Sequence, residues 1–383
     1  MKFYIIAGEA SGDLHGSNLM KGIYRNCPDA EIRFRGGDMM AAVGGTKVRD
    51  YREGAVMGLS DVLRKAGRLL TDLRDCKRDI AAWKPDAVIL IDYPGFNLKI
   101  ARFAHKAGFR VFYYIAPKVW ASREGRIRQI RRYVDRLFII FPFEIPYFQA
   151  RGVDFVYKGN PLVDAIDSSG AMKASREEFL RSSGLPDRPY LAFLAGSRKG
   201  EISRMMPVLM QLADRLHSLP QYRDWRFVVA GAPARDASDY EEYISGREYV
   251  DLLFGRTREI VRHAAAAVVN SGTASLETVL LGTPQVVCWS TSPLTWFAAT
   301  HILRVQKHIS YVSLGNLCVN RPVFRELLQD DFNADTLEAE VRRLVEDAAY
   351  RDEMLRGYAQ IREVLGGSGA SEAVAEAMIS SLK

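Results

Sequence analysis

Residues 2–13 read KFYIIAGEASGD and show the pattern from which the architecture of the chain can be predicted. The first six of these residues are largely apolar and lead into a glycine-containing loop, after which helical spacing continues through Leu19 and Ile23. This order predicts a buried strand, a tight loop and a helix. Because the hydrophobicity is continuous rather than alternating, the strand is expected to be parallel and covered on both faces.

The same order of apolar run, polar loop and helix recurs in two series along the chain. The further apolar runs are Ala87 to Ile91, Val111 to Ile115, Leu137 to Ile140, Tyr190 to Leu194, Phe227 to Ala230, Ala266 to Val269 and Gln285 to Cys288. Between the two series, the segment SSGAMKASREEF (168–179) is rich in small and charged residues and is interpreted as a linker between the domains. The pattern predicts an α/β protein with two Rossmann-like, doubly wound domains, 1–168 and 169–345, and a helical tail, 346–383, that packs back on the body.

Bulk composition agrees with a globular two-domain protein. The chain has 383 residues, 48% hydrophobic and 26% charged, which is too long for one ordinary core. No apolar run reaches the roughly 18 residues of a membrane-spanning helix, and the first apolar run is too short for a signal peptide, so a cytoplasmic location is expected. The net charge of +7 favours an anionic partner.

The first loop joins a strand to a helix and contains Gly8, Glu9, Ser11, Gly12 and Asp13. The glycines permit a tight turn and close approach of a ligand. The loop matches neither a dinucleotide nor an ATP phosphate-binding motif, and its two carboxylates favour a sugar or hydroxyl partner. The alternative is a plain turn in which Ser11 or Asp13 caps the helix.

Two further loops of the first half carry polar side chains after buried strands. Asp92 ends one strand, where a partly desolvated carboxylate can act as a general base on a hydroxyl, and Asn97 follows in the same loop. Either residue can instead cap the next helix. The loop after Val111 to Ile115 offers Trp120 and Arg123, although Trp120 can equally serve in interdomain packing.

Two turns in the second half are suited to a diphosphate. Ser197 and Arg198 lie between a strand and a helix start, where backbone N–H groups and a guanidinium can meet phosphate oxygens. Ser271, Gly272 and Thr273 have the same setting, and Glu277, one helical turn later, can accept from ribose hydroxyls. The alternative for the first turn is that Arg198 is solvated and Ser197 only caps the helix. The alternative for the second is that Glu277 only interacts favourably with the helix dipole.

Basic residues gather on one predicted amphipathic helix, Val62 to Arg78. Arg64, Lys65 and Arg68, with the apolar Leu69 and Leu70, can dock on anionic lipid headgroups, or form an ordinary solvated face. No nucleic-acid-binding module accompanies the charge, so no nucleic-acid partner is expected. Histidines and cysteines show no paired-ligand spacing, and neither a metal nor another cofactor is expected.

Six segments together resemble, in order, the motif series of the lipid-A-disaccharide synthases, covering residues 5 to about 330. They are IIAGEASGD, IDYPGFN, APKVWASR, LAGSRKGE, NSGTASLE and YVSLGNL. The chain departs from the family pattern at Ala195, where the family often has proline, and at Lys118 and Ser122, which are not assigned as ligands.

The resemblance implies the glycosyltransferase B architecture, in which two Rossmann-like domains face each other across a cleft. It implies transfer of 2,3-diacylglucosamine from UDP-2,3-diacylglucosamine to 2,3-diacylglucosamine 1-phosphate, forming a β-1,6 linkage and releasing UDP. By position, Asp92 matches the general base, and Glu9, Ser11 and Asp13 match the glycine-rich loop near the acceptor, where Glu9 and Asp13 are further candidates for a catalytic role. Gly8, Gly12, Asn97, Trp120 and Arg123 are assigned to the same acceptor side, and Arg198, Ser271 to Glu277 and Asn316 match the donor side. An inverting single displacement at the cytoplasmic face of the inner membrane is therefore expected, and a homodimer is left open.

Two alternatives compete with this reading. Another UDP-sugar enzyme of the same architecture, such as a peptidoglycan-type N-acetylglucosaminyltransferase or a UDP-sugar epimerase, would share these patterns. A protein of a different class, a membrane-associated module that binds a nucleotide sugar without turnover, would also have these sequence patterns.

Overall fold

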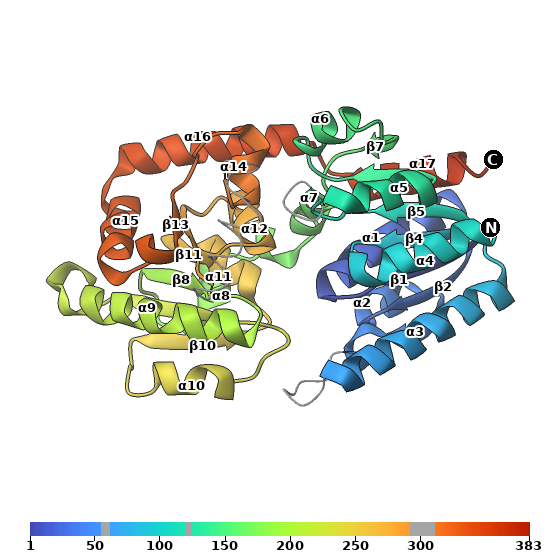
Figure 1. The fold of residues 1–383 in the computed structure, drawn as a ribbon. Coiled ribbons are helices and arrows are strands. Elements are labelled where there is room, and N and C mark those ends of the chain that lie inside the picture. Colours follow the sequence, from blue (N-terminus) through green and yellow to red (C-terminus); the bar gives the residue numbers. More distant parts are fainter. Residues whose placement is uncertain (55–61, 120–123, 292–310) are drawn as a thin grey trace. The chain divides into compact units, whose positions relative to one another are not determined.

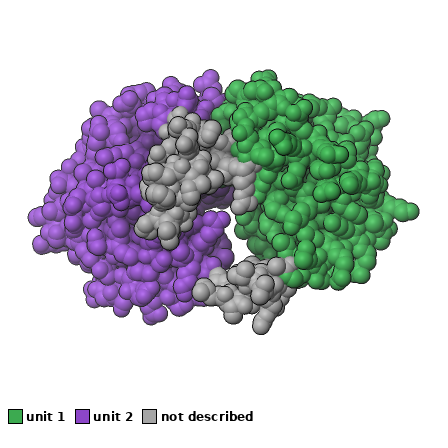
Figure 2. All heavy atoms as spheres, viewed as in Figure 1, with its two compact units in different colours: residues 1–165, 365–383 green, residues 166–364 purple. Residues whose placement is uncertain are grey.

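The computed structural model describes residues 1–54, 62–119, 124–291 and 311–383. By its internal contacts the chain divides into two compact units, residues 1–165 with 365–383, and residues 166–364 (Figure 2). Each unit is a parallel sheet covered by helices (Figure 1). The chain enters unit 2 after Ala165 and returns to unit 1 at Leu365.

The sheet of unit 1 has, within the described residues, the strand order β3-β2-β1-β4-β5-β6-β7, and every pair is parallel. This is the order of a doubly wound Rossmann-like fold, extended by one strand. The strands are β1 (Lys2–Ala7), β2 (Glu31–Gly36), β3 (Thr46–Asp50), β4 (Ala87–Ile91), β5 (Arg110–Tyr114), β6 (Arg136–Ile139) and β7 (Phe155–Tyr157).

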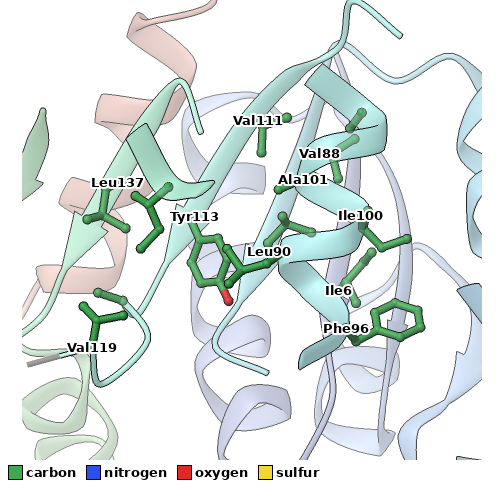
Figure 3. Packing of buried hydrophobic residues seen from close by; sticks show 14 of the residues in the cluster. Ile6, Val88, Leu90, Phe96, Ile100, Ala101, Val111, Tyr113, Val119 and Leu137 are labelled. Atoms are coloured by element: carbon green, nitrogen blue, oxygen red, sulfur yellow. The ribbon is translucent and has the colours of Figure 1, made fainter. Parts of the chain in front are cut away.

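Helices cover both faces of this sheet. On one face, α3, α4 and α5 bury Leu90, Tyr113 and their neighbours in one apolar cluster (Figure 3). On the other face, α1 packs against α17, and Arg25 pairs with Glu372 at 2.7 Å. The helices are α1 (Ala10–Asn26), α2 (Asp38–Val43), α3 (Val62–Trp83), α4 (Pro94–Lys106), α5 (Ile127–Tyr133), α6 (Glu144–Gln149), α7 (Pro161–Asp167) and α17 (Ala370–Ser380).

The sheet of unit 2 has the order β10-β9-β8-β11-β12-β13 in the described chain, again all parallel. The strands are β8 (Tyr190–Leu194), β9 (Arg226–Gly231), β10 (Val250–Phe254), β11 (Ala266–Asn270), β12 (Gln285–Trp289) and β13 (Glu326–Leu328). The helices are α8 (Arg176–Ser183), α9 (Lys199–Ser218), α10 (Ser238–Ile244), α11 (Thr257–His263), α12 (Thr273–Leu281), α14 (Leu314–Val319), α15 (Ala334–Glu346) and α16 (Ala348–Leu365). Contacts join α9 to α10 and α15, and α12 to α11 and α14.

The predicted class, two doubly wound α/β domains, is therefore confirmed. Each predicted apolar run forms a strand within one or two residues of its expected bounds. Strands β2, β3, β7, β10 and β13 were absent from the sequence-based prediction.

Candidate functional site

The point where strand order reverses lies between β1 and β4 in unit 1 and between β8 and β11 in unit 2. Ligands of doubly wound sheets bind at such points, beyond the carboxyl ends of the strands. Ala7 pairs with Ile91, so the loops beginning at Gly8 and Asp92 start side by side. Leu194 likewise pairs with Val269, which places the 195–198 and 270–273 turns together.

The backbone at the end of β4 is strained. Asp92 and Tyr93 have φ values of 42° and 46°, the left-handed region that non-glycine residues rarely adopt. Each such residue costs about 1–3 kcal/mol and persists only where the surroundings impose it. The Tyr93 ring stacks on Phe96 with 5.6 Å between centroids, and a methyl group at Gly8 would come within 2.3 Å of the Tyr93 ring. Gly8 therefore provides the space that this reversed turn needs.

Asp92 is half-buried and carries a perturbed carboxyl group. Burial, helped by the negative charge of Glu9, raises its pKa to about 6, against an opposing effect of Lys118 and Arg126. A carboxyl group with this pKa is ionised at neutral pH yet binds a proton readily, as a general base requires. The structure thus places the predicted base at the switch point with suitable acidity.

The two other acidic residues predicted for the first loop differ in setting, because α1 begins at Ala10: Glu9 directly precedes the helix, whereas Ser11, Gly12 and Asp13 lie in its first turn. Glu9 is exposed and its carboxylate accepts from Ser11 Oγ at 2.7 Å. Asp13 is buried, and its carboxylate accepts from the N–H groups of Gly37, Met39 and Met40 at 2.7, 3.1 and 3.2 Å. Asp13 therefore caps α2, not α1, and this arrangement does not support a catalytic role for it. Gly12 is also buried, because α1 packs closely on Ala7 of β1 there.

Asn97, predicted to lie in the loop after β4, belongs instead to the first part of α4, because the helix already begins at Pro94, and its side chain faces inward. Its side chain is fully buried, and Nδ2 donates to the carbonyl oxygens of Ile91 and Asp92 at 3.1 and 2.8 Å. Trp120 and Arg123, predicted for the acceptor loop, lie outside the described residues.

In unit 2 the turn after β8 is organised by a glutamate that the sequence did not single out. The Glu201 carboxylate accepts from the N–H groups of Ser197 and Arg198 at 2.9 and 3.2 Å and from the Arg198 guanidinium at 3.1 Å. These N–H groups, expected to meet a diphosphate, are thus engaged within the turn. The Arg198 side chain is 78% exposed, so its guanidinium is what this turn offers to an anion. Glu201 stands three residues after the N-cap Arg198, the spacing of a capping box.

The turn after β11 leads directly into α12. The N–H group of Ser271 donates to the Cys288 carbonyl at 2.8 Å, whereas no described residue accepts from the N–H groups of Gly272 and Thr273. A methyl group on Gly272 would meet no described atom within 4 Å. Gly272 and Thr273 therefore form an open helix N-terminus of the kind that can stabilise phosphate oxygens, whereas the main-chain N–H of Ser271 is already engaged.

Two further residues predicted for the donor side have partners inside the protein. Glu277 pairs with Arg258 at 2.9 Å, an arginine that sequence analysis missed because it comes from α11. Asn316 is fully buried, donates to the Phe324 carbonyl and to Glu326, and accepts from the N–H groups of Val323 and Phe324. Direct donor contact by Asn316 would require these bonds to break.

The predicted basic helix exists as α3. The side chains of Arg64, Lys65 and Arg68 lie outside the described residues. Leu70 is 64% exposed, but Leu69 packs partly against the core, because successive helical residues point about 100° apart. Of the helices in the described ranges, none is long and apolar enough to cross a membrane. The described residues also hold no group of three or more His, Cys, Asp or Glu side chains suited to a metal.

Solved structures of this architecture resemble the chain in fold. A UDP-GlcNAc 2-epimerase from Neisseria meningitidis, solved bound to UDP-GlcNAc, aligns with a TM-score of 0.72 at 12% identity, covering 99% of this chain and 100% of that one. The calicheamicin glycosyltransferase CalG4 aligns with a TM-score of 0.59 at 15% identity, covering 100% of this chain and 97% of that one. Two doubly wound parallel α/β units with these structural matches define the glycosyltransferase B architecture.

Sequence relationships identify the family within that class. Residues 3–374 match the family model described as lipid-A-disaccharide synthetase, so the chain belongs to this family and has lipid-A-disaccharide synthase activity. A lipid-A-disaccharide synthase of Geobacter metallireducens is 38% identical over 374 residues, 97% of this chain and 94% of the relative. That of Myxococcus xanthus is 38% identical over 379 residues, 99% of this chain and 97% of the relative.

Proposed function

We propose that the chain transfers 2,3-diacylglucosamine from UDP-2,3-diacylglucosamine to the 6-hydroxyl of 2,3-diacylglucosamine 1-phosphate. Unit 1 binds the acceptor and unit 2 binds the donor. The observation that carries this assignment is Asp92, a carboxyl group of raised pKa at the switch point of unit 1. Arg198 and the open N-terminus of α12 support the donor assignment in unit 2.

The proposed reaction is an inverting single displacement. Asp92 takes the proton of the acceptor's 6-hydroxyl as its oxygen bonds to the anomeric carbon of the donor. The bond from that carbon to the UDP oxygen breaks on the opposite face, which gives the β-1,6 linkage. In this proposal the negative charge that develops on UDP is stabilised by the Arg198 guanidinium and the N–H groups of Gly272 and Thr273.

An assay with both substrates and a chelator tests reaction class and metal independence together. We expect UDP release to require donor and acceptor, to need an acylated donor, and to stay within about twofold when EDTA is present, because protein donors stabilise the leaving group. UDP-GlcNAc in place of the acylated donor is the control. Turnover with UDP-GlcNAc alone would indicate an epimerase, and loss of all turnover with EDTA would contradict the metal-free mechanism.

The pH dependence of kcat/KM reports the acidity of the base in the free enzyme. Because only ionised Asp92 can accept a proton, we expect kcat/KM to rise with pH through a midpoint near 6. Since the charge of Glu9 helps to raise this pKa, Glu9→Gln should move the midpoint to lower pH. A profile with no acid limb between pH 4.5 and 7 would contradict Asp92 as the base.

We propose peripheral attachment to an anionic membrane surface through α3, since the acceptor carries acyl chains. Neutralising Arg64, Lys65 and Arg68 should reduce binding to vesicles that contain anionic lipid by about a hundredfold, at about 1 kcal/mol per basic residue near the surface. The matched control neutralises Lys173, Arg181 and Arg223, two arginines and a lysine exposed on unit 2. Equal binding by both variants would exclude α3 as the docking surface.

A further inference from the structure

The main-chain carbonyl of Asp92 accepts hydrogen bonds from two side chains. Tyr113 Oη donates to it at 2.5 Å, and Asn97 Nδ2 donates at 2.8 Å. The N–H group of Asp92 in turn donates to the Tyr114 carbonyl at 3.1 Å. Both polar groups of the Asp92 backbone are therefore fixed, one by β5 and the other by side chains of β5 and α4.

These bonds hold a conformation that the chain would otherwise avoid. Asp92 and the next residue, Tyr93, are both left-handed, and a left-handed pair without glycine must be imposed by its surroundings. The direction of the Asp92 Cα–Cβ bond, and with it the position of the carboxyl group, depends on that backbone. Hydrogen bonds to the Asp92 carbonyl thus act on the carboxyl group through the main chain.

Water cannot easily replace either donor. Tyr113 and Asn97 are both fully buried. The Tyr113 ring lies among the aliphatic side chains of Leu90, Leu137 and Val119, with its hydroxyl oxygen at the edge of the cluster (Figure 3). Removing the hydroxyl would leave the Asp92 carbonyl one partner short, without adding a new group.

We propose that Tyr113 and Asn97 are positioning residues for the transfer reaction, which hold the Asp92 carbonyl and thereby aim its carboxyl group at the acceptor hydroxyl. This inference rests on the proposed role of Asp92 as the base. Productive geometry must be kept to within about half an ångström, and a displacement of 1 Å can lower the rate about a hundredfold. Neither residue needs to contact a substrate for this effect.

The test is Tyr113→Phe in the full-length protein, assayed with saturating donor and varied acceptor. We expect kcat to fall about tenfold to a hundredfold, while the acceptor KM changes by less than about threefold, because the binding surface is retained. The matched control is Tyr190→Phe. Tyr190 is also buried and donates to a main-chain carbonyl, that of Ile260 at 2.7 Å, but it lies at the amino end of β8. It should lower the melting temperature about as much and leave kcat unchanged.

Asn97→Ala removes the second donor to the Asp92 carbonyl, and the Tyr113→Phe/Asn97→Ala double variant removes both, so the test does not depend on Tyr113→Phe alone. Since both side chains hold the same carbonyl, the loss of kcat in the double variant should be smaller than the product of the single losses. If Tyr113→Phe and Asn97→Ala both keep kcat within threefold of the parent while Asp92→Asn is inactive, the positioning role is overturned and the base survives. Full activity of Asp92→Asn would instead overturn the proposed base.

Discussion

Asp92→Asn should lower turnover roughly 10²- to 10⁴-fold, the usual contribution of a general base. Asparagine keeps the shape of the side chain and tolerates the left-handed backbone at this position, so the fold should persist. It cannot take the proton of the acceptor hydroxyl. The measurement is kcat at pH 8 with both substrates saturating, where Asp92 in the parent is ionised.

The same substitution should stabilise the protein, with a definite dependence on pH. The pKa of Asp92 is raised in the folded state, so its ionisation destabilises the fold as pH rises from about 4 toward 6 and by a constant amount above that. Asparagine has no such penalty. The melting temperature of Asp92→Asn should therefore exceed that of the parent by more at pH 8 than at pH 4.5.

Asp86→Asn is the control for this pair of effects. Asp86 directly precedes β4, whereas Asp92 directly follows it, and the exposed Asp86 carboxylate accepts from the Lys2 N–H at 2.7 Å. Its replacement should reduce stability slightly and leave turnover intact. An Asp92→Asn enzyme with near-normal kcat would remove this carboxylate from the mechanism.

Strands with four or more consecutive apolar residues could be predicted, whereas very short strands and strands interrupted by charged residues could not. The missed strand β2 carries Arg33 and Arg35 in its sequence EIRFRG. In the fold Arg33 pairs with Asp79 and the buried Arg35 pairs with Asp72, both from α3. Those partners are about 40 residues away in sequence, so no local pattern shows that the charges are neutralised. Whether such a charged segment forms a strand therefore depends on ion pairs with other elements more than on its own strand propensity.

The loops of the site were predictable because polar residues after buried strands meet at one edge of a parallel sheet. What individual side chains do there depends on contacts that a sequence does not show. Asp13 and Asn97 hold backbone groups inside unit 1. Of the missed residues, Glu201 lies at the spacing of a capping box, but Arg198 stands at the N-cap where that motif has serine or threonine, so the signal was incomplete. The bond from Tyr113 to Asp92 joins neighbouring strands and had no signal in the sequence.

A methyl group at Gly196 should strongly impair donor use. Gly196 has φ of +105°, and an added Cβ would lie 2.6 Å from Glu201 Oε2 and 2.7 Å from Asn270 Nδ2. Gly196→Ala must therefore displace the carboxylate that organises the β8 turn, and with it Arg198. We expect kcat/KM for the donor to fall about a hundredfold, the effect of moving a binding group by about 1 Å.

The Gly196→Ala result combines two effects, backbone strain from a left-handed alanine and displacement of Glu201. Gly246→Ala is the control that has only the backbone strain. Gly246 also lies in unit 2 and has φ of +78°, but an added Cβ would meet no described atom within 4 Å. Both variants should lose stability from the left-handed alanine, measured as melting temperature. Only Gly196→Ala should also lose donor kcat/KM, because only there does the new methyl group reach Glu201. If the two variants keep equal donor kcat/KM, the β8 turn does not hold the leaving group, and the donor site of unit 2 must be built from the α12 turn alone.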